Sequence, residues 1–193
     1  ATALAVSALG DSVTTNDDLL NAQDNPNDWV MNHGSYAATR YSKLDQINTD
    51  NVGDLQLKFT VGLGGMDPGS FWEWANNQAT PLVEDGMIYT TNGWGQLYKI
   101  NVRKADQGVD VIEWIFDPEM DKDWVGAVAC CSISNRGVAL WQDSLIYGIL
   151  DGRLLRIRKS DGTKVWEVQL ADPAVAETIT VAPLVIGDIA ISG

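Results

Sequence analysis

A repeat of about 51 residues is the feature that most constrains how this chain can fold. Residues 81–89 (PLVEDGMIY) have the pattern of a strand, a turn and a strand, and residues 138–147 (VALWQDSLIY) and 182–191 (APLVIGDIAI) have the same form. Pro81 and Pro183 stand 102 residues apart, which is two periods. A period of this size is near the upper end for β-propeller repeats. The repeat therefore predicts a series of similar β-sheet units.

Each complete unit is expected to continue into two further strands. We expect the third strand at residues 96–101 and 153–158, and the fourth at residues 111–116 and 163–170. Four strands per unit at this period predict an all-β fold, a β-propeller of four-stranded blades. The third unit reaches Gly193 after two strands. Because a propeller closes with about four to eight blades, we expect the chain to be part of a longer protein.

The two expected fourth strands each carry one tryptophan, Trp114 and Trp166. Either indole could be a plain core residue. Their matched places in successive blades favour a second interpretation, in which the indole wedges between neighbouring blades.

The N-terminal third is more polar and less regular. Residues 15–20 (TNDDLL) predict a short capped helix, because Thr is a good N-cap. Residues 55–61 alternate between apolar and polar side chains, which predicts a strand and the possible start of another blade. We divide the chain into residues 1–28, a flexible N-terminal segment or the remnant of a secretion signal, and residues 29–193, the blades of a propeller incomplete at its C-terminus.

Charge and hydropathy exclude several classes of partner. The formal net charge is −13, which argues against nucleic acid and against anionic membrane surfaces. No apolar run approaches the roughly 18 residues of a membrane span. Hydrophobic content of 45% and charged content of 20% are those of an ordinary globular protein.

Cys130 and Cys131 are adjacent, and the chain has no other cysteine. A disulfide between them would close a strained ring, because neighbouring Cα atoms lie about 3.8 Å apart and disulfides want roughly 4.4–6.8 Å. Such a ring would add little stability, since it encloses no loop. It could instead present a flat apolar plate to a ligand, with the planar cation of Arg136 five residues later. Two buried free thiols are the alternative from these residues alone.

Four passages resemble the pyrroloquinoline quinone (PQQ)-dependent alcohol dehydrogenases of the methanol dehydrogenase large-subunit type. They are RYSKLDQIN at residues 40–48, ATPLVEDGMIY at residues 79–89, the double cysteine with NRG at residues 135–137, and ETITVAPLV at residues 177–185. The family fold is an eight-bladed propeller. The resemblance therefore implies that this chain is roughly the first third of such a propeller.

The resemblance also implies roles for particular residues. Cys130 and Cys131 would form a vicinal disulfide that stacks on one face of the quinone. Arg136 would lie near the reactive quinone oxygens and polarise them. Thr180 would hydrogen-bond a cofactor carboxylate. Gln78 stands where the family usually has Glu, and we keep it as a cofactor contact because an amide can still donate and accept.

The activity implied by the resemblance is that of a periplasmic enzyme which oxidises an alcohol by hydride transfer to PQQ and passes electrons to a cytochrome c. Its catalytic Asp and the ligands of its calcium or lanthanide ion belong to later blades, so we expect this chain to hold no metal and to be inactive without the remainder of the propeller. His33, the only histidine, is expected in a surface loop. The alternative is a non-catalytic propeller of similar repeats that serves as a scaffold for protein partners. The double cysteine and Arg136 disfavour it, since a scaffold has no use for a strained sulfur plate beside a cation.

The first testable prediction concerns the cysteine pair. We expect Cys130 and Cys131 to be oxidised to each other, because they are adjacent and no other cysteine can compete. Thiol labelling of the denatured, unreduced protein should then find no free thiol, and labelling after reduction should find two. Two labelled cysteines before reduction would contradict the prediction.

Overall fold

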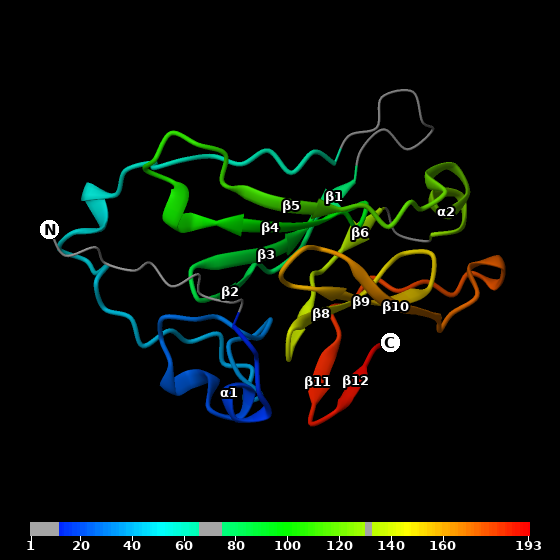
Figure 1. Cartoon of the computed structure of the whole chain (residues 1–193), viewed down its shortest axis with the longest axis horizontal. Coiled ribbons are helices and arrows are strands. Elements are labelled where there is room, and N and C mark those ends of the chain that lie inside the picture. The colour runs from blue at the N-terminus through cyan, green and yellow to red at the C-terminus, as the bar shows by residue number, and fades with distance from the viewer. Residues whose placement is uncertain (1–11, 66–74, 130–132) are drawn as a thin grey trace, which may run out of the picture.

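The computed structural model describes residues 12–65, 75–129 and 133–193. In these residues two antiparallel sheets of four strands each dominate the fold, and a two-stranded hairpin follows them (Figure 1). The first sheet is β2 (Leu82–Glu84), β3 (Met87–Thr91), β4 (Leu97–Asn101) and β5 (Ile112–Phe116); the second is β7 (Ala139–Trp141), β8 (Ser144–Gly148), β9 (Arg153–Arg158) and β10 (Lys164–Gln169); the hairpin is β11 (Leu184–Ile186) and β12 (Ile189–Ile191). In each sheet the strands lie side by side in chain order. Two successive blades and the first half of a third are therefore confirmed.

Shorter elements connect and flank the blades. They are the helices α1 (Asn16–Leu20) and α2 (Lys122–Val128), the short strands β1 (Asn76–Asn77) and β6 (Ser134–Asn135), and 3₁₀ turns at Ala22–Asp24, Val52–Asp54, Val102–Lys104 and Pro173–Val175. Thr15 caps α1 in a capping box with Asp18, as the sequence predicts. No helix in the described ranges is long and apolar enough to cross a bilayer.

The sequence repeat corresponds to one turn type. In each unit a two-residue turn joins the first strand to the second, and the first turn residue has a positive φ: 47° at Asp85, 52° at Gln142 and 58° at Gly187. Two-residue hairpins favour such turns because their twist matches that of the flanking strands. The Asp and Gly residues at these turns make the repeat recognisable in the sequence. Gln142 adopts the same positive-φ conformation although it is not glycine.

Trp114 confirms the expectation of an indole between blades. It lies on β5 of the first blade, and its Nε1–H donates to the backbone carbonyl of Lys159 in the second blade at 3.0 Å. The indole lies so close to Gly162 that a Cβ added there would stand 2.8 Å from the ring atom Cδ2. Trp166 holds the matching place on β10 but is 38% exposed, so its wedging role stays a prediction.

A buried ion pair joins the same two blades. The ammonium of Lys159, 0% exposed, lies 2.6 Å from a carboxylate oxygen of Glu84, which is 7% exposed and ends β2. Lys159 Nζ also donates to Thr14 Oγ1 at 2.6 Å, and the Thr14 hydroxyl donates to the second Glu84 oxygen at 2.5 Å. Thr14 precedes α1, so the N-terminal segment, the first blade and the second blade meet at one closed polar cluster.

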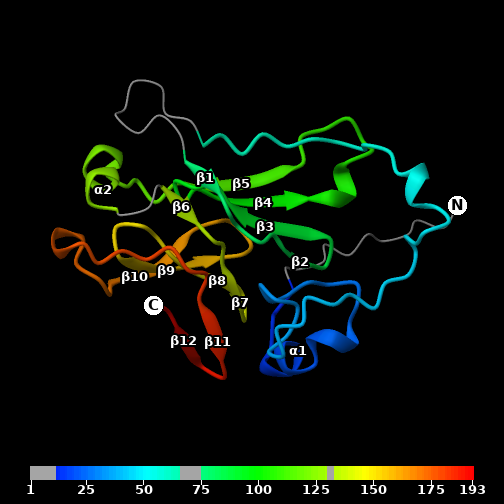
Figure 2. The ribbon, with the colours of Figure 1, turned by 180° about the vertical axis from the view of Figure 1, so that it is seen from behind.

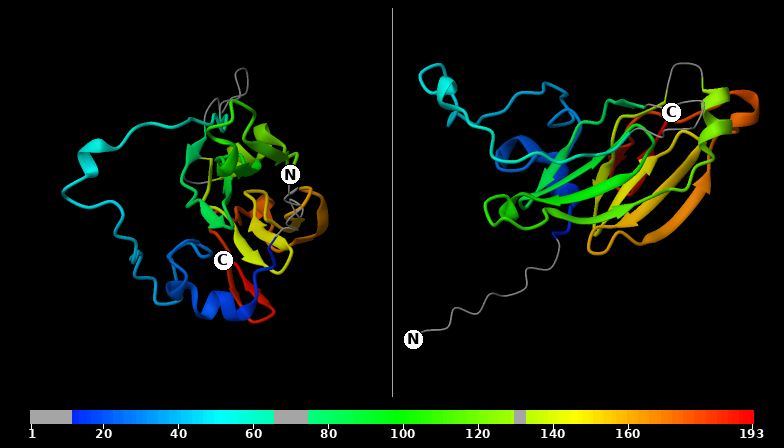
Figure 3. Two further views of the ribbon diagram at one scale, coloured as in Figure 1. Left: turned by 60° about the vertical axis from the view of Figure 1, so that its left-hand side comes forward. Right: turned by 90° about the horizontal axis from the view of Figure 1, so that it is seen from above.

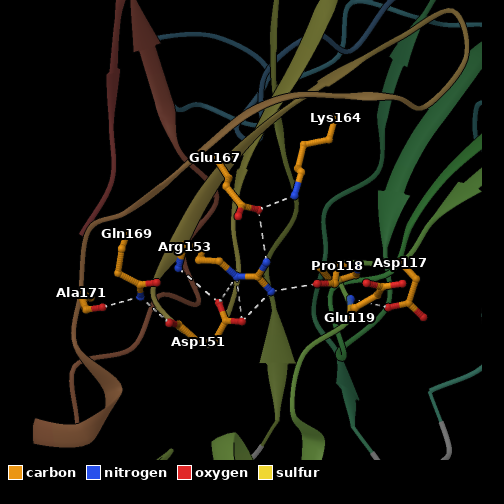
Figure 4. Close-up of polar contacts among 9 residues, drawn as sticks. All are labelled: Asp117, Pro118, Glu119, Asp151, Arg153, Lys164, Glu167, Gln169 and Ala171. Atoms are coloured by element: carbon orange, nitrogen blue, oxygen red, sulfur yellow. Dashed lines mark hydrogen bonds and ion pairs between the residues drawn. The ribbon is translucent and has the colours of Figure 1, made fainter.

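A second contact between the blades involves Arg153 on β9 (Figure 4). Its Nη2 donates to the carbonyl of Pro118, in the loop that leaves the first blade, at 2.8 Å. Asp151 accepts from the Arg153 guanidinium at 2.7 to 3.1 Å, and this hydrogen bonding raises the pKa of Arg153. Glu167 on β10 pairs with the same guanidinium at 3.3 Å.

The expected strand at residues 55–61 does not form. The backbone from residue 55 to residue 65 pairs with no sheet in the part of the chain that the structure describes, and Leu57 is 81% exposed. Figure 3 shows the preceding segment, in cyan, arching away from the sheets. The prediction was wrong because alternation reports a side-chain pattern, whereas a strand exists only beside a neighbouring backbone.

The second testable prediction concerns the buried ion pair. Lys159→Met should lower the free energy of unfolding by about 3–5 kcal/mol, because it leaves the Glu84 carboxylate buried without its cation. Urea denaturation measures the loss. Arg158→Met is the matched control, since Arg158 pairs with Asp161 at 3.5 Å on the surface and such pairs contribute about 0–1 kcal/mol. Equal losses in the two variants would contradict the role given to the buried pair.

Candidate functional site

A short parallel strand pair brings the predicted site residues to one edge. β1 pairs with β6, with Asn76 beside Ser134 and Asn77 beside Asn135. Figure 2, from behind, shows this pair where the ends of the two four-stranded sheets approach each other. In a parallel pair the residues that follow both strands leave at the same end. Gln78 follows β1 and Arg136 follows β6, so both residues leave the strands at the same edge.

Arg136 and Thr180 are in direct contact although 44 residues separate them. The Arg136 backbone N–H donates to the Thr180 carbonyl at 3.0 Å, and Arg136 Nη1 donates to the Thr180 hydroxyl. The Thr80 N–H approaches the Arg136 carbonyl at 3.4 Å. Thus three chain segments, from the start of each blade, meet around Arg136.

The Arg136 side chain remains exposed at this junction. Within the described ranges no carboxylate lies within ion-pair distance of it. The described side-chain partner of Arg136 is a neutral hydroxyl, which leaves further donors for a ligand because guanidinium carries five N–H groups in a planar fork. The arrangement can therefore bind an anion or polarise a carbonyl-type oxygen.

Gln78 is exposed, and among the described residues no hydrogen bond joins it to Arg136. It stands two residues before Thr80, whose backbone approaches Arg136, so it borders the same edge. The structure thus brings Arg136 and Thr180 into contact and leaves Gln78 beside them. Cys130 and Cys131 lie outside the described residues, and their pairing stays a prediction.

Asn135 is the residue that sequence reasoning left without a role. Its side chain is 2% exposed and hydrogen-bonds Thr91 of the first blade and Gly148 of the second. Gly137 follows with φ +112°, and a Cβ there would lie 3.2 Å from the Thr80 carbonyl oxygen. The NRG run carried the sequence signal, because Asn and Gly are turn-forming residues and their places on both sides of Arg136 favour a turn.

In the residues open to description, no group of three or more His, Cys, Asp or Glu side chains could hold a metal ion. His33 lies exposed in a loop, as expected, and its Nδ1 accepts from Arg40 Nε at 3.2 Å.

Comparison with known proteins gives a consistent family. Residues 29–168 match the PQQ family described as glucose/ethanol/alcohol dehydrogenase, beta-propeller domain. The chain is 33% identical over 192 residues to a lanthanide-dependent methanol dehydrogenase of Methylacidiphilum fumariolicum (strain SolV), with 97% of this chain covered. It is 36% identical over 159 residues to a quinohemoprotein alcohol dehydrogenase of Comamonas testosteroni, with 82% of this chain covered.

The backbone agrees with these sequence matches. A europium-containing methanol dehydrogenase superposes with a TM-score of 0.81 at 31% identity and covers 92% of this chain. The chain spans only 29% of that structure, and 30% and 20% of the two sequence relatives. It therefore corresponds to a minor part of each of these enzymes.

The third testable prediction concerns the contact between Arg136 and Thr180. Thr180→Val removes the hydroxyl that accepts from Arg136 Nη1, so the free energy of unfolding should fall by about 0.5–1.5 kcal/mol. Thr180→Ser keeps the hydroxyl and should stay within about 0.5 kcal/mol of the unchanged protein. Urea denaturation of the two variants side by side measures the difference. No loss in Thr180→Val would contradict the prediction, and a loss confined to Thr180→Ser would mean that the methyl group, not the hydrogen bond, matters.

Proposed function

Because this chain belongs to the PQQ β-propeller family of glucose, ethanol and alcohol dehydrogenases, we propose that it forms the first blades of a quinoprotein that oxidises an alcohol by hydride transfer to PQQ. Electrons then pass to a cytochrome c. The observation that carries the proposal is the exposed guanidinium of Arg136, held by Thr180 at the junction of the blades with no carboxylate paired to it in the described ranges.

The residues at this edge fit the cofactor. PQQ offers carboxylates and a pair of adjacent quinone oxygens, all of which are hydrogen-bond acceptors. The edge presents the guanidinium of Arg136, the hydroxyl of Thr180 and the amide of Gln78, all of which can donate. A planar fork suits two neighbouring oxygens better than a point charge does.

When bound, PQQ supplies the electron-accepting quinone that takes the hydride of the alcohol carbon. Arg136 would donate to the quinone oxygens, and its positive charge would stabilise the negative charge that develops on them. Thr180 has a second function besides holding Arg136, since its hydroxyl can hydrogen-bond a cofactor carboxylate. Gln78 borders this edge and adds a neutral donor, which avoids placing two carboxylates together.

Further parts of the proposed site follow from the family resemblance. Cys130 and Cys131 would present an oxidised sulfur plate to one face of the quinone, which requires an oxidising compartment and supports a periplasmic location. A calcium or lanthanide ion would be held by oxygen ligands from the remainder of the propeller. The substrate class is a small primary or secondary alcohol.

The fourth testable prediction is that Arg136→Lys in the full-length enzyme lowers turnover by about 10²–10³-fold while the melting temperature stays close to its original value. An ammonium cannot copy the fork of a guanidinium, and losing one such donor has an effect of this size in other enzymes. The measurement is the steady-state rate with saturating PQQ, metal and alcohol.

Arg158→Lys is the control for that experiment, because Arg158 makes a surface pair with Asp161 and lies outside the site. Its turnover should be unchanged. If Arg136→Lys also keeps normal turnover, Arg136 is not part of the catalytic machinery, and a non-catalytic scaffold becomes the better interpretation.

A further inference from the structure

We propose that Asn135 is the positioning residue of Arg136: its carboxamide ties the turn that carries Arg136 to both blades and so sets where the guanidinium lies. The inference rests on the proposed function, in which Arg136 contacts the cofactor. It assigns a role to Asn135 and to its partner Thr91 on β3, both of which are buried and neither of which needs to touch a ligand.

The hydrogen bonds define the orientation of this amide. Asn135 Oδ1 accepts from the Gly137 backbone N–H at 2.9 Å, and Asn135 Nδ2 donates to the Gly148 carbonyl at 2.8 Å. A backbone N–H can only donate and a carbonyl can only accept, so exchanging the amide oxygen and nitrogen would break both bonds. The Thr91 hydroxyl then donates to Oδ1 at 2.9 Å, which fills the second lone pair of that oxygen.

One of these bonds closes a turn around Arg136. Asn135 precedes Arg136 and Gly137 follows it, so the bond from Gly137 N–H to the Asn135 side chain spans the arginine in the manner of an Asx-turn. Both neighbours are buried while Arg136 is exposed at the apex. Its backbone is held from both sides as well, by Thr180 and by Thr80. The turn therefore leaves Arg136 little freedom except in its side chain.

The other two bonds attach this turn to equivalent points of adjacent blades. Thr91 is the last residue of β3 and Gly148 the last residue of β8, and each of these is the second strand of its blade. A shift of one blade relative to the other would pull the Asn135 amide away from one of its partners. Since misplacing a catalytic group by about 1 Å can lower a rate by about 10²-fold, a two-point attachment is a means of keeping Arg136 in register.

The test measures PQQ affinity of the full-length apoenzyme in the presence of metal, by absorbance titration, together with the melting temperature. Thr91→Val keeps the shape of the side chain but removes the hydroxyl donor, and PQQ affinity should fall about 3–10-fold. Thr91→Ser restores the donor and should stay within about twofold of the unchanged protein. Asn135→Leu removes all three bonds and should weaken PQQ binding by about 10–100-fold.

Arg153→Leu is the matched control, because Arg153 also connects the two blades, through the Pro118 carbonyl (Figure 4), and none of its described side-chain hydrogen bonds involves the Arg136 turn. It should lower the melting temperature and leave PQQ affinity unchanged. If Arg153→Leu weakens PQQ binding as much as Thr91→Val at a similar melting temperature, the effect is general loosening and the proposal is overturned. Unchanged affinity in Thr91→Val also overturns it, whether or not Asn135→Leu folds.

Arg136→Lys, measured in the same titration, separates this inference from the function on which it rests. If Arg136→Lys weakens PQQ binding and the Thr91 and Asn135 variants do not, Arg136 is a cofactor contact but needs no positioning by Asn135. If Arg136→Lys leaves binding and turnover unchanged, the proposed function fails and the positioning role fails with it.

Discussion

The buried ion pair of Glu84 and Lys159 is the constraint on which the arrangement of the two blades depends. Taking both charges out of water costs several kcal/mol per ion unless each finds a close partner, so the pair tolerates little displacement. Glu84 ends the first strand of one blade and Lys159 follows the third strand of the next. Thr14 completes the cluster from the N-terminal segment. Three distant parts of the chain therefore have to be in register before these charges are satisfied.

The Asn135 amide also requires the two blades to be in register, at a second point of their junction. It does so through neutral groups instead of charges. The hydrogen bonds of an amide are directional, so they define the position of the groups that they join. The ion pair therefore determines which strands of the two blades face each other. The hydrogen bonds of the amide then position the end of β6 and, directly after it, Arg136. In the proposed function, the position of Arg136 at the cofactor edge therefore depends on the contact between the blades and not on any single strand.

What could be predicted from the sequence was local or periodic. The repeat marks hairpins because two-residue turns select Asp and Gly, the TNDDLL run marks a cap, and the matched place of Trp114 indicates a wedge. The pairs Glu84 with Lys159 and Asn135 with Thr91 join residues 75 and 44 positions apart, and no local signal specifies such partners. Residues 55–61 show the converse: their alternation is real, but it cannot supply the neighbouring backbone that a strand requires.

The side chain of Arg136 is exposed, while other residues make the hydrogen bonds that hold its turn. Hydrogen bonds to Asn135, Thr180 and Thr80 hold the backbone of the turn, and the Arg136 side chain remains exposed. A structural arginine in such a junction would be expected to find a carboxylate, as Arg153 does in Asp151 and Arg156 in Asp143. Arg136 has only the neutral Thr180 hydroxyl in the described ranges. An exposed cation that no described carboxylate neutralises keeps donors for an acceptor-rich ligand, and this is the physical reason for the proposed role of Arg136 at a cofactor site.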